Sequence, residues 1–191
     1  MYRELTKRSA MKKYFLTLLA IASLALTSIV TSSMSYAQSP FPLPEYSKVY
    51  DDSRDPFKDA LAAIALAKQT NRNVLIEIGG NWCTWCHKMD AFLAKNADIY
   101  QQLHQNYVLL KVNVSDSNSN QAFMKGLPPV LGYPHMYISN GDGKMLLSKD
   151  TAELLVGNNY SRDNWLNFLA KWQVKNTQSV TQSVIQPTTK G

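Results

Sequence analysis

The chain has 191 residues, a length that suits one domain with extensions. Its 20 lysines and arginines exceed its 14 aspartates and glutamates, so the formal net charge is +6. Residues 1–37 hold five of the basic residues and one of the acidic ones, which leaves 15 against 13 and a net charge of only +2 for the remainder. Because the remainder has no stripe of lysine or arginine, the composition argues against nucleic-acid binding.

Residues 1–37 are typical of a secretory signal peptide. Two lysines precede an apolar stretch over residues 15–26, and residues 35–37, Ser-Tyr-Ala, offer the small side chains that a signal peptidase reads. Met11 is an alternative start, because the signal that follows it is complete. The alternative to cleavage is a membrane anchor over residues 14–30, but the stretch is short and rich in serine and threonine for a span of ~20 apolar residues. We therefore predict export to the periplasm.

Residues 38–54 contain three prolines at alternate positions and are predicted to form an extended lead-in. Asp55 then precedes Pro56, the pattern of an N-cap followed by proline at the first helical position. A helix is predicted from there to Thr70. Its apolar stripe recurs at helical spacing and consists of Phe57, Leu61, Ile64 and Ala65.

The central motif begins with a β-branched, apolar run over Val74–Ile78 that ends at two glycines and predicts a buried strand. Trp82 follows, and then the chain's only two cysteines, Cys83 and Cys86, at the start of a predicted helix. At the first turn of a helix, unpaired backbone N–H groups and the helix dipole favour thiolate over thiol. We therefore expect Cys83 to be the exposed, attacking thiol and Cys86, one turn later, to be the more buried resolving thiol.

Two other interpretations of the cysteine pair are weaker. A purely structural disulfide would close so short a ring that it would remove little entropy from the unfolded chain. A zinc site usually has four ligands, and the sequence lacks a second cysteine or histidine pair at ligand spacing. No metal site is predicted.

The rest of the chain alternates helical and extended patterns. After the motif helix, a break near Asn96 and a second short helix with His104 on its surface are predicted. The further predicted elements are strands over 107–114 and 135–139, a helical turn over 121–125, a hairpin turn over 140–143 with a returning strand over 144–148, and a last helix capped by Ser161 with an apolar stripe of Trp165, Phe168, Leu169 and Trp172.

The buried strand, the Trp-Cys-x-x-Cys helix start and a later Gly132-Tyr133-Pro134 resemble the thioredoxin superfamily. The resemblance is strongest to thioredoxin-like domains of bacterial envelope proteins, such as the C-terminal domain of the transmembrane disulfide-reducing exporter. It implies an α/β thioredoxin-like fold, a mixed central β-sheet flanked by helices on both faces, over residues 55–175. Residues 176–191 are polar and repetitive, and are predicted to be a disordered tail.

The resemblance also implies roles for single residues. Glu77 lies six residues before Cys83, where the superfamily places a buried carboxylate that can accept the proton of Cys86; an outward-facing edge glutamate is the alternative. Tyr133–Pro134 is expected to be a cis peptide that faces the cysteines and exposes backbone to an extended substrate segment. An ordinary trans proline is the alternative there.

The residues beside the pair have two interpretations each. Trp82 and Trp85 are predicted to bind substrate polypeptide as an apolar rim, or to cover the helix start; we favour the rim for Trp85 and the cover for Trp82. His87 either raises the thiolate character of the pair or is a solvated surface residue.

The function predicted is a periplasmic thiol–disulfide oxidoreductase that acts through a mixed disulfide, with envelope proteins as substrates and no small-molecule cofactor. Thr84 and Trp85, between the cysteines, include no histidine, and so lack the imidazole of the strong periplasmic oxidases. We therefore expect a pair that reduces or isomerises disulfides. In an oxidising compartment this requires an electron donor, expected to be a membrane-embedded partner.

Two alternatives come from other classes of protein. The first is a soft-metal module that holds Cu(I) through Cys83 and Cys86, with His87 nearby. The second is a non-catalytic peptide-binding module that uses the Tyr133–Pro134 edge.

Overall fold

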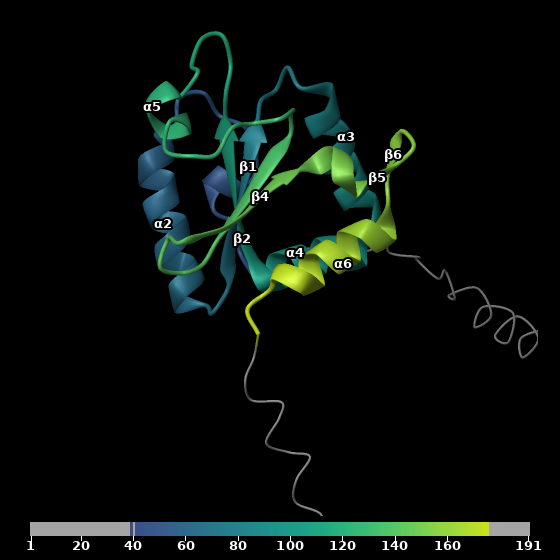
Figure 1. Cartoon of the computed structure of the whole chain (residues 1–191). Coiled ribbons are helices and arrows are strands. Elements are labelled where there is room, and N and C mark those ends of the chain that lie inside the picture. Colours follow the sequence, from purple (N-terminus) through teal and green to yellow (C-terminus); the bar gives the residue numbers. More distant parts are fainter. Residues whose placement is uncertain (1–38, 40, 176–191) are drawn as a thin grey trace, which may run out of the picture. The chain divides into compact units, whose positions relative to one another are not determined.

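The computed structural model describes residue 39 and residues 41–175. At the centre of this part is a four-stranded mixed sheet with strand order β2-β1-β3-β4 (Figure 1). Its strands are β1 (Asn73–Gly79), β2 (Tyr107–Asn113), β3 (His135–Ser139) and β4 (Met145–Asp150). β1 pairs with β2 in parallel and with β3 antiparallel, and β3 pairs with β4 antiparallel. The predicted mixed sheet is therefore confirmed.

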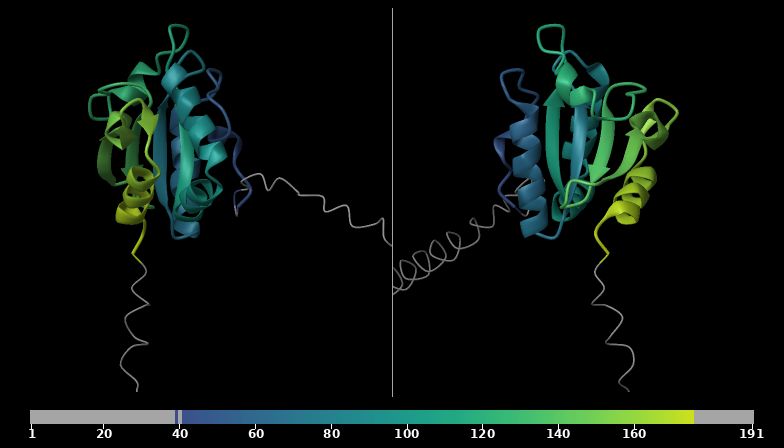
Figure 2. Two further views of the ribbon diagram at one scale, coloured as in Figure 1. Left: turned by 90° about the vertical axis from the view of Figure 1, so that its right-hand side faces the viewer. Right: turned by 60° about the vertical axis from the view of Figure 1, so that its left-hand side comes forward.

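Helices cover both faces of the sheet. Figure 2 shows α2 (Pro56–Gln69) on one side of the sheet and α6 (Arg162–Trp172) on the other. The helices α3 (Thr84–Lys95) and α4 (Ala97–Asn106) share the side of α6, and their apolar residues form one core cluster with it. Side chains alternate along β1, so that Val74, Ile76 and Ile78 join the core under α2 and Leu75 joins the core under α3, α4 and α6.

The remaining elements are short. They are the 3-10 helices η1 (Glu45–Ser47) and η2 (Thr151–Leu154), the one-turn helix α5 (Gln121–Met124), and the hairpin of β5 (Leu155–Val156) and β6 (Asn159–Tyr160). The segment that carries η1 lies beside the edge strand β2, where the Ser47 hydroxyl donates a hydrogen bond to the carbonyl of Leu109. The sequence predicted α5 and missed the other four.

Helix boundaries agree with the capping signals. The Asp55 carboxylate accepts hydrogen bonds from the backbone N–H groups of Phe57 and Lys58, and the Ser161 hydroxyl accepts one from Asn164. These contacts satisfy N–H groups that a helix start leaves unpaired, which is why both starts were predictable.

The predicted apolar stripe of α2 is correct at Ile64, which packs against the core, but wrong at its other positions. Phe57 and Leu61 are 52% and 70% exposed, whereas Ala63 and Ala67 are fully buried. The small side chains of these alanines let the helix backbone approach the strands closely. Phe57 instead packs edge-on against Phe123 of α5, with ring centroids 5.2 Å apart.

The prediction that His104 lies on the surface is also wrong, since this residue is 2% exposed. The predicted signal peptide over 1–37 and the predicted tail over 176–191 lie outside the described residues. Among residues 39 and 41–175, no helix has both the length and the apolar character needed to cross a membrane.

Candidate active site around the Cys83–Cys86 disulfide

The cysteine pair lies where β1 leads into α3. Cys83 is the N-cap residue of α3, and its backbone N–H donates to the carbonyl of Gly80 at 3.0 Å. Cys83 and Cys86 form a disulfide with their Cα atoms 5.2 Å apart, and the N–H of Cys86 donates to the sulfur of Cys83 at 3.1 Å. The predicted position of Cys83 at the helix start is confirmed.

The predicted exposure of Cys83 is wrong. Cys83 is 3% exposed and Cys86 is 0% exposed, so both sulfurs are covered in this disulfide form. The cover is local, because Tyr50 clusters with the two cysteines and the partly buried Trp85 and Tyr133 pack against this cluster.

Gly79 makes close packing beneath the pair possible. A Cβ atom at this position would lie 2.6 Å from the sulfur of Cys86 and 2.6 Å from the hydroxyl oxygen of Tyr50, closer than atoms can approach. Only glycine therefore allows the end of β1, Cys86 and Tyr50 to meet here.

A buried group of polar side chains lies beneath the disulfide. The Tyr50 hydroxyl donates a hydrogen bond to Oε1 of Glu77, and Nζ of Lys111 lies 3.9 Å from the same oxygen. Lys111 also donates to Asp90 of α3, with 2.6 Å between Nζ and Oδ1. The predicted burial of Glu77 is confirmed, and the outward-facing alternative is excluded.

The electrostatics of this group follow from burial and from the neighbouring charges. Burial raises the pKa of Glu77, while the charge of Lys111 and the hydrogen bond from Tyr50 act against that rise and Asp90 adds to it. Burial by itself lowers the pKa of Lys111, but Glu77 and Asp90 outweigh it, and the pKa is raised. Glu77 is thus a carboxyl whose pKa lies above its usual value.

Sequence reasoning missed Tyr50, Lys111 and Asp90. A signal existed for Lys111, because it interrupts an apolar strand in the same way as Glu77, and the two are register partners on β2 and β1. No signal existed for Tyr50, which belongs to the segment predicted as an extended lead-in.

The two tryptophans differ in exposure. Trp82, favoured as a cover, is 56% exposed; its indole N–H donates to the carbonyl of Val114 at 2.6 Å, and its ring meets Tyr133 edge-on. Trp85, favoured as a rim, is half-buried and meets the ring of Tyr160 edge-on. Both roles stay predictions, but both rings lie beside the cysteine pair.

The predicted cis peptide between Tyr133 and Pro134 is confirmed. Beside it is a cavity of about 290 Å³, whose lining includes Trp85, Tyr133, Leu131, Leu155 and Tyr160. The structure thus brings together all the residues that the sequence predicted around the pair.

The surrounding histidine and acidic residues do not form a metal centre. His87 is exposed, with Nε2 2.8 Å from the carbonyl oxygen of Asn81. Within the described part of the chain, no three or more histidine, cysteine, aspartate or glutamate side chains are grouped so that they could hold a metal ion.

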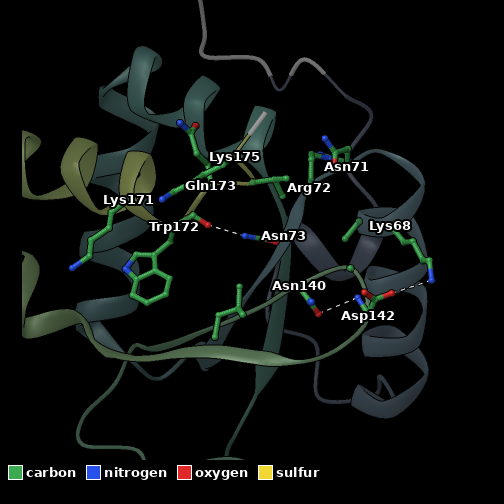
Figure 3. A pocket seen from close by; sticks show the side chains of 14 residues that line it. Lys68, Asn71, Arg72, Asn73, Asn140, Asp142, Lys171, Trp172, Gln173 and Lys175 are labelled. Atoms are coloured by element: carbon green, nitrogen blue, oxygen red, sulfur yellow. Dashed lines mark hydrogen bonds and ion pairs between the residues drawn. The ribbon is translucent and has the colours of Figure 1, made fainter. Parts of the chain in front are cut away.

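A second, larger cavity of about 660 Å³ lies near the first residue of β1, at the other end of the strand from the cysteines (Figure 3). Its lining includes the cationic side chains of Lys68, Arg72 and Lys171. Figure 3 also shows Lys68 paired with Asp142. No residue predicted for the site lines this cavity.

Comparisons with known proteins agree with this geometry. A family model described as thioredoxin-like matches residues 55–140. A solved disulphide isomerase from Xylella fastidiosa Temecula1 is 26% identical, with a TM-score of 0.54 over 69% of this chain and 97% of that one. A comparison with curated proteins finds no match.

Two further solved structures are more distant. The C-terminal domain of DsbD from Neisseria meningitidis, in the oxidised form, is 17% identical, with a TM-score of 0.46 over 61% of this chain and 95% of that one. A thioredoxin from Thermus thermophilus is 21% identical, with a TM-score of 0.42 over 58% of this chain and 80% of that one.

Proposed function

This chain is a thioredoxin-like thiol–disulfide oxidoreductase, and we propose that it reduces or isomerises the disulfide bonds of envelope proteins in the periplasm. The observation that carries the proposal is the Cys83–Cys86 disulfide at the start of α3, directly beside a buried carboxyl network. The similar Xylella protein is described as a disulphide isomerase, which supports the isomerising activity.

The reaction starts from the reduced pair. The Cys83 thiolate attacks one sulfur of a substrate disulfide, a Cys83–substrate bond forms, and the other substrate sulfur leaves as a thiolate. Cys86 then loses its proton and attacks the sulfur of Cys83, which expels the second substrate thiolate and leaves the Cys83–Cys86 disulfide. Two electrons pass to the substrate.

The helix start supplies the stabilisation that the first step needs. The N–H of Cys86 points at the sulfur of Cys83, and the N-terminal end of α3 adds its positive dipole. In the second step we assign Glu77 as the acceptor of the Cys86 proton. A carboxyl with a raised pKa is suited to accept a thiol proton near neutral pH and later return it.

Substrate binding is assigned to the surface around the pair. Trp85 and Tyr133 pack against the cluster that holds the disulfide and line the adjoining cavity of about 290 Å³. Trp82 meets the ring of Tyr133, and Pro134 follows Tyr133 in the cis peptide. Aromatic rings offer large apolar contact area to a polypeptide whose sequence varies. An extended segment of substrate that lies against Tyr133–Pro134 would bring its disulfide to Cys83.

The direction of electron flow is inferred from the residues between the cysteines. Thr84 and Trp85 provide no imidazole to stabilise the thiolate of Cys83, so the pair should not be a strong oxidant. A reducing or isomerising protein in an oxidising compartment must be kept reduced. We therefore propose a membrane-embedded electron donor as its second partner.

Trapping tests this proposal directly. A Cys86→Ala variant expressed with its full leader should accumulate mixed disulfides between Cys83 and envelope proteins, because the resolving thiol is missing. Periplasmic extracts run on non-reducing gels would show these as bands that disappear on reduction. The Cys83→Ala variant is the matched control and should trap far less.

Equal trapping by both variants, or none by either, would contradict the assigned chemistry. Trapped partners found only in the cytoplasm would contradict the location. Equilibration of the purified chain with glutathione would test the direction, since a potential near ~−120 mV, typical of strong oxidases, would make it a disulfide donor.

A further inference from the structure

Tyr50 precedes the part of the chain that matches the family model, yet it belongs to the site. It is buried, packs against both cysteines and donates a hydrogen bond to Glu77. We propose that the Tyr50 hydroxyl relays the proton between Cys86 and Glu77. This inference rests on the proposed function, because it concerns the step in which Cys86 becomes a thiolate.

The packing around Gly79 brings the Tyr50 hydroxyl close to the sulfur of Cys86. The sulfur of Cys86 and the hydroxyl oxygen of Tyr50 each lie 2.6 Å from the same point, the position that a Cβ on Gly79 would occupy. The two atoms are therefore no more than twice that distance apart. The same hydroxyl is hydrogen-bonded to Oε1 of Glu77, so it neighbours both ends of the transfer.

Several contacts hold Tyr50 in this position. The side-chain amide of Asn81 donates to the carbonyl of Tyr50 at 3.0 Å. Nζ of Lys111 lies 4.9 Å from the centroid of the tyrosine ring. Earlier in the same segment, the Ser47 hydroxyl donates a hydrogen bond to the carbonyl of Leu109 on the edge strand β2. These contacts hold the backbone and ring of Tyr50, and the segment that carries it, in place.

Titratable side chains on three neighbouring elements act on Tyr50 and Glu77. Lys111 of β2 and Asp90 of α3 act on Glu77, and Glu77, Asp90 and Tyr160 of β6 act on Tyr50. Burial, followed by the charge of Glu77, raises the pKa of Tyr50 well above its usual value. The phenol therefore keeps a proton throughout, and it can take part only by receiving one proton as it gives up another.

The transfer balances as a relay. The S–H bond of Cys86 breaks and its proton goes to the Tyr50 oxygen, while the proton that Tyr50 held goes to the Glu77 carboxylate. The Cys86 thiolate then attacks Cys83 and expels the substrate thiolate. Tyr50 ends as it began, and Glu77 carries the proton.

Release of nitrothiobenzoate separates the two chemical steps. When the reduced full chain reacts with dithiobis-nitrobenzoate, attack by Cys83 releases one coloured thiolate and attack by Cys86 on the mixed disulfide releases a second. Stopped-flow absorbance across a range of pH gives both rates. Tyr50→Phe should leave the first rate unchanged and slow the second by about tenfold or more at neutral pH, with its pH dependence displaced upward.

Three variants identify the cause. Tyr46→Phe is the matched control, because Tyr46 is a buried tyrosine of the same segment that belongs to the core under α2, and its second release should match the wild type. Glu77→Gln should slow the second release as Tyr50→Phe does. The double variant should be no slower than Glu77→Gln alone, because the hydroxyl acts only through Glu77.

The wild-type chain provides a test that needs no variant. In mixtures of light and heavy water, the rate of the second release should curve with deuterium content, as expected when two protons move. A linear dependence, or a Tyr50→Phe chain with a wild-type rate at every pH, would overturn the relay. Failure of the proposed function looks different, since the wild-type chain itself would then release no second thiolate.

Discussion

The two buried charges beneath the disulfide are brought together by strand register. Glu77 and Lys111 occupy partner positions on the parallel strands β1 and β2, and both side chains face the core side that carries α3. A buried ion pair contributes little net stability, but removal of one partner leaves an uncompensated charge, typically at a cost of about 3–5 kcal/mol. Stability alone therefore gives little reason for this pair, and the proposed proton transfer gives it a function.

His104 is a second buried titratable residue, and its surroundings are different. Its ring packs against Tyr100 with centroids 4.4 Å apart. Burial, and then the positive charges of Arg72 and Lys111, lowers the pKa of His104 to about 4. The polar sequence of α4 suggested a surface position, but the side chain lies on the inner side of the helix with Leu103.

The lowered pKa of His104 predicts a loss of stability in acid. Below its ordinary pKa of 6.5 the unfolded chain binds a proton at this site, whereas the folded chain binds it only near pH 4. The free energy of unfolding should therefore fall by about 3 kcal/mol from this site as the pH drops through that window. His104→Gln should remove this part of the pH dependence, measured by urea unfolding at pH 7 and pH 4.5.

An exposed, non-titrating residue of the same helix provides the control for this measurement. Gln101→Ala should lose as much stability between the two pH values as the wild type does, because it removes no ionisable group. If His104→Gln also follows the wild type, the histidine does not carry the acid sensitivity.

Among the elements, α2 shows that local sequence decides where a helix begins and ends, whereas tertiary packing decides which face it buries. Its capping and length follow from local sequence, but its fully buried positions are the alanines Ala63 and Ala67, and Ile64 is only partly buried. Leu61 is left largely exposed, and Phe57 makes a lateral contact with α5. The face that a helix buries depends on how closely it must approach its sheet.

Substitutions on the two faces of α2 should therefore change the free energy of unfolding by different amounts. Ala63→Leu adds volume against the sheet and should lower the free energy of unfolding by about 1–3 kcal/mol. Leu61→Ala, the matched change on the outer face, should alter it by no more than about 0.5 kcal/mol. Chemical denaturation measures both, and the reverse ranking would restore the stripe predicted from the sequence.

At the scale of the whole molecule, residues 41–54 are part of the folded structure. It buries Tyr46, Ser47 and Tyr50, lies beside β2 and reaches the disulfide. The domain predicted over residues 55–175 would lack these side chains. Loss of these buried contacts should matter, because the net stability of a folded protein is typically only about 5–15 kcal/mol.

Removal of residues 38–54 should accordingly be severe. Burial of the apolar surface of these two tyrosines alone corresponds to a stabilisation of about 5 kcal/mol as an upper estimate. A chain that begins at residue 55 should unfold at much lower denaturant concentration than one that begins at residue 38, and it should resolve mixed disulfides slowly. Equal midpoints for the two chains would make the segment a lead-in only.

The sequence by itself determined the four strands of the sheet, the main helices and the chemistry of the motif. Caps, strand runs and the helix start at Cys83 depend on residues within a few positions of one another, so local patterns reveal them. The thioredoxin-like fold and the cis peptide were implied by the resemblance of the motif to a known superfamily.

Only the tertiary structure decided which distant residues complete the site. Tyr50 meets Glu77 across 27 residues of chain, and Lys111 meets it through the pairing of two strands. The burial of Cys83 likewise depends on Tyr133, 50 positions later in the numbering, and on Tyr50. Such contacts depend on how separate segments pack, and periodicity within one segment carries no information about them.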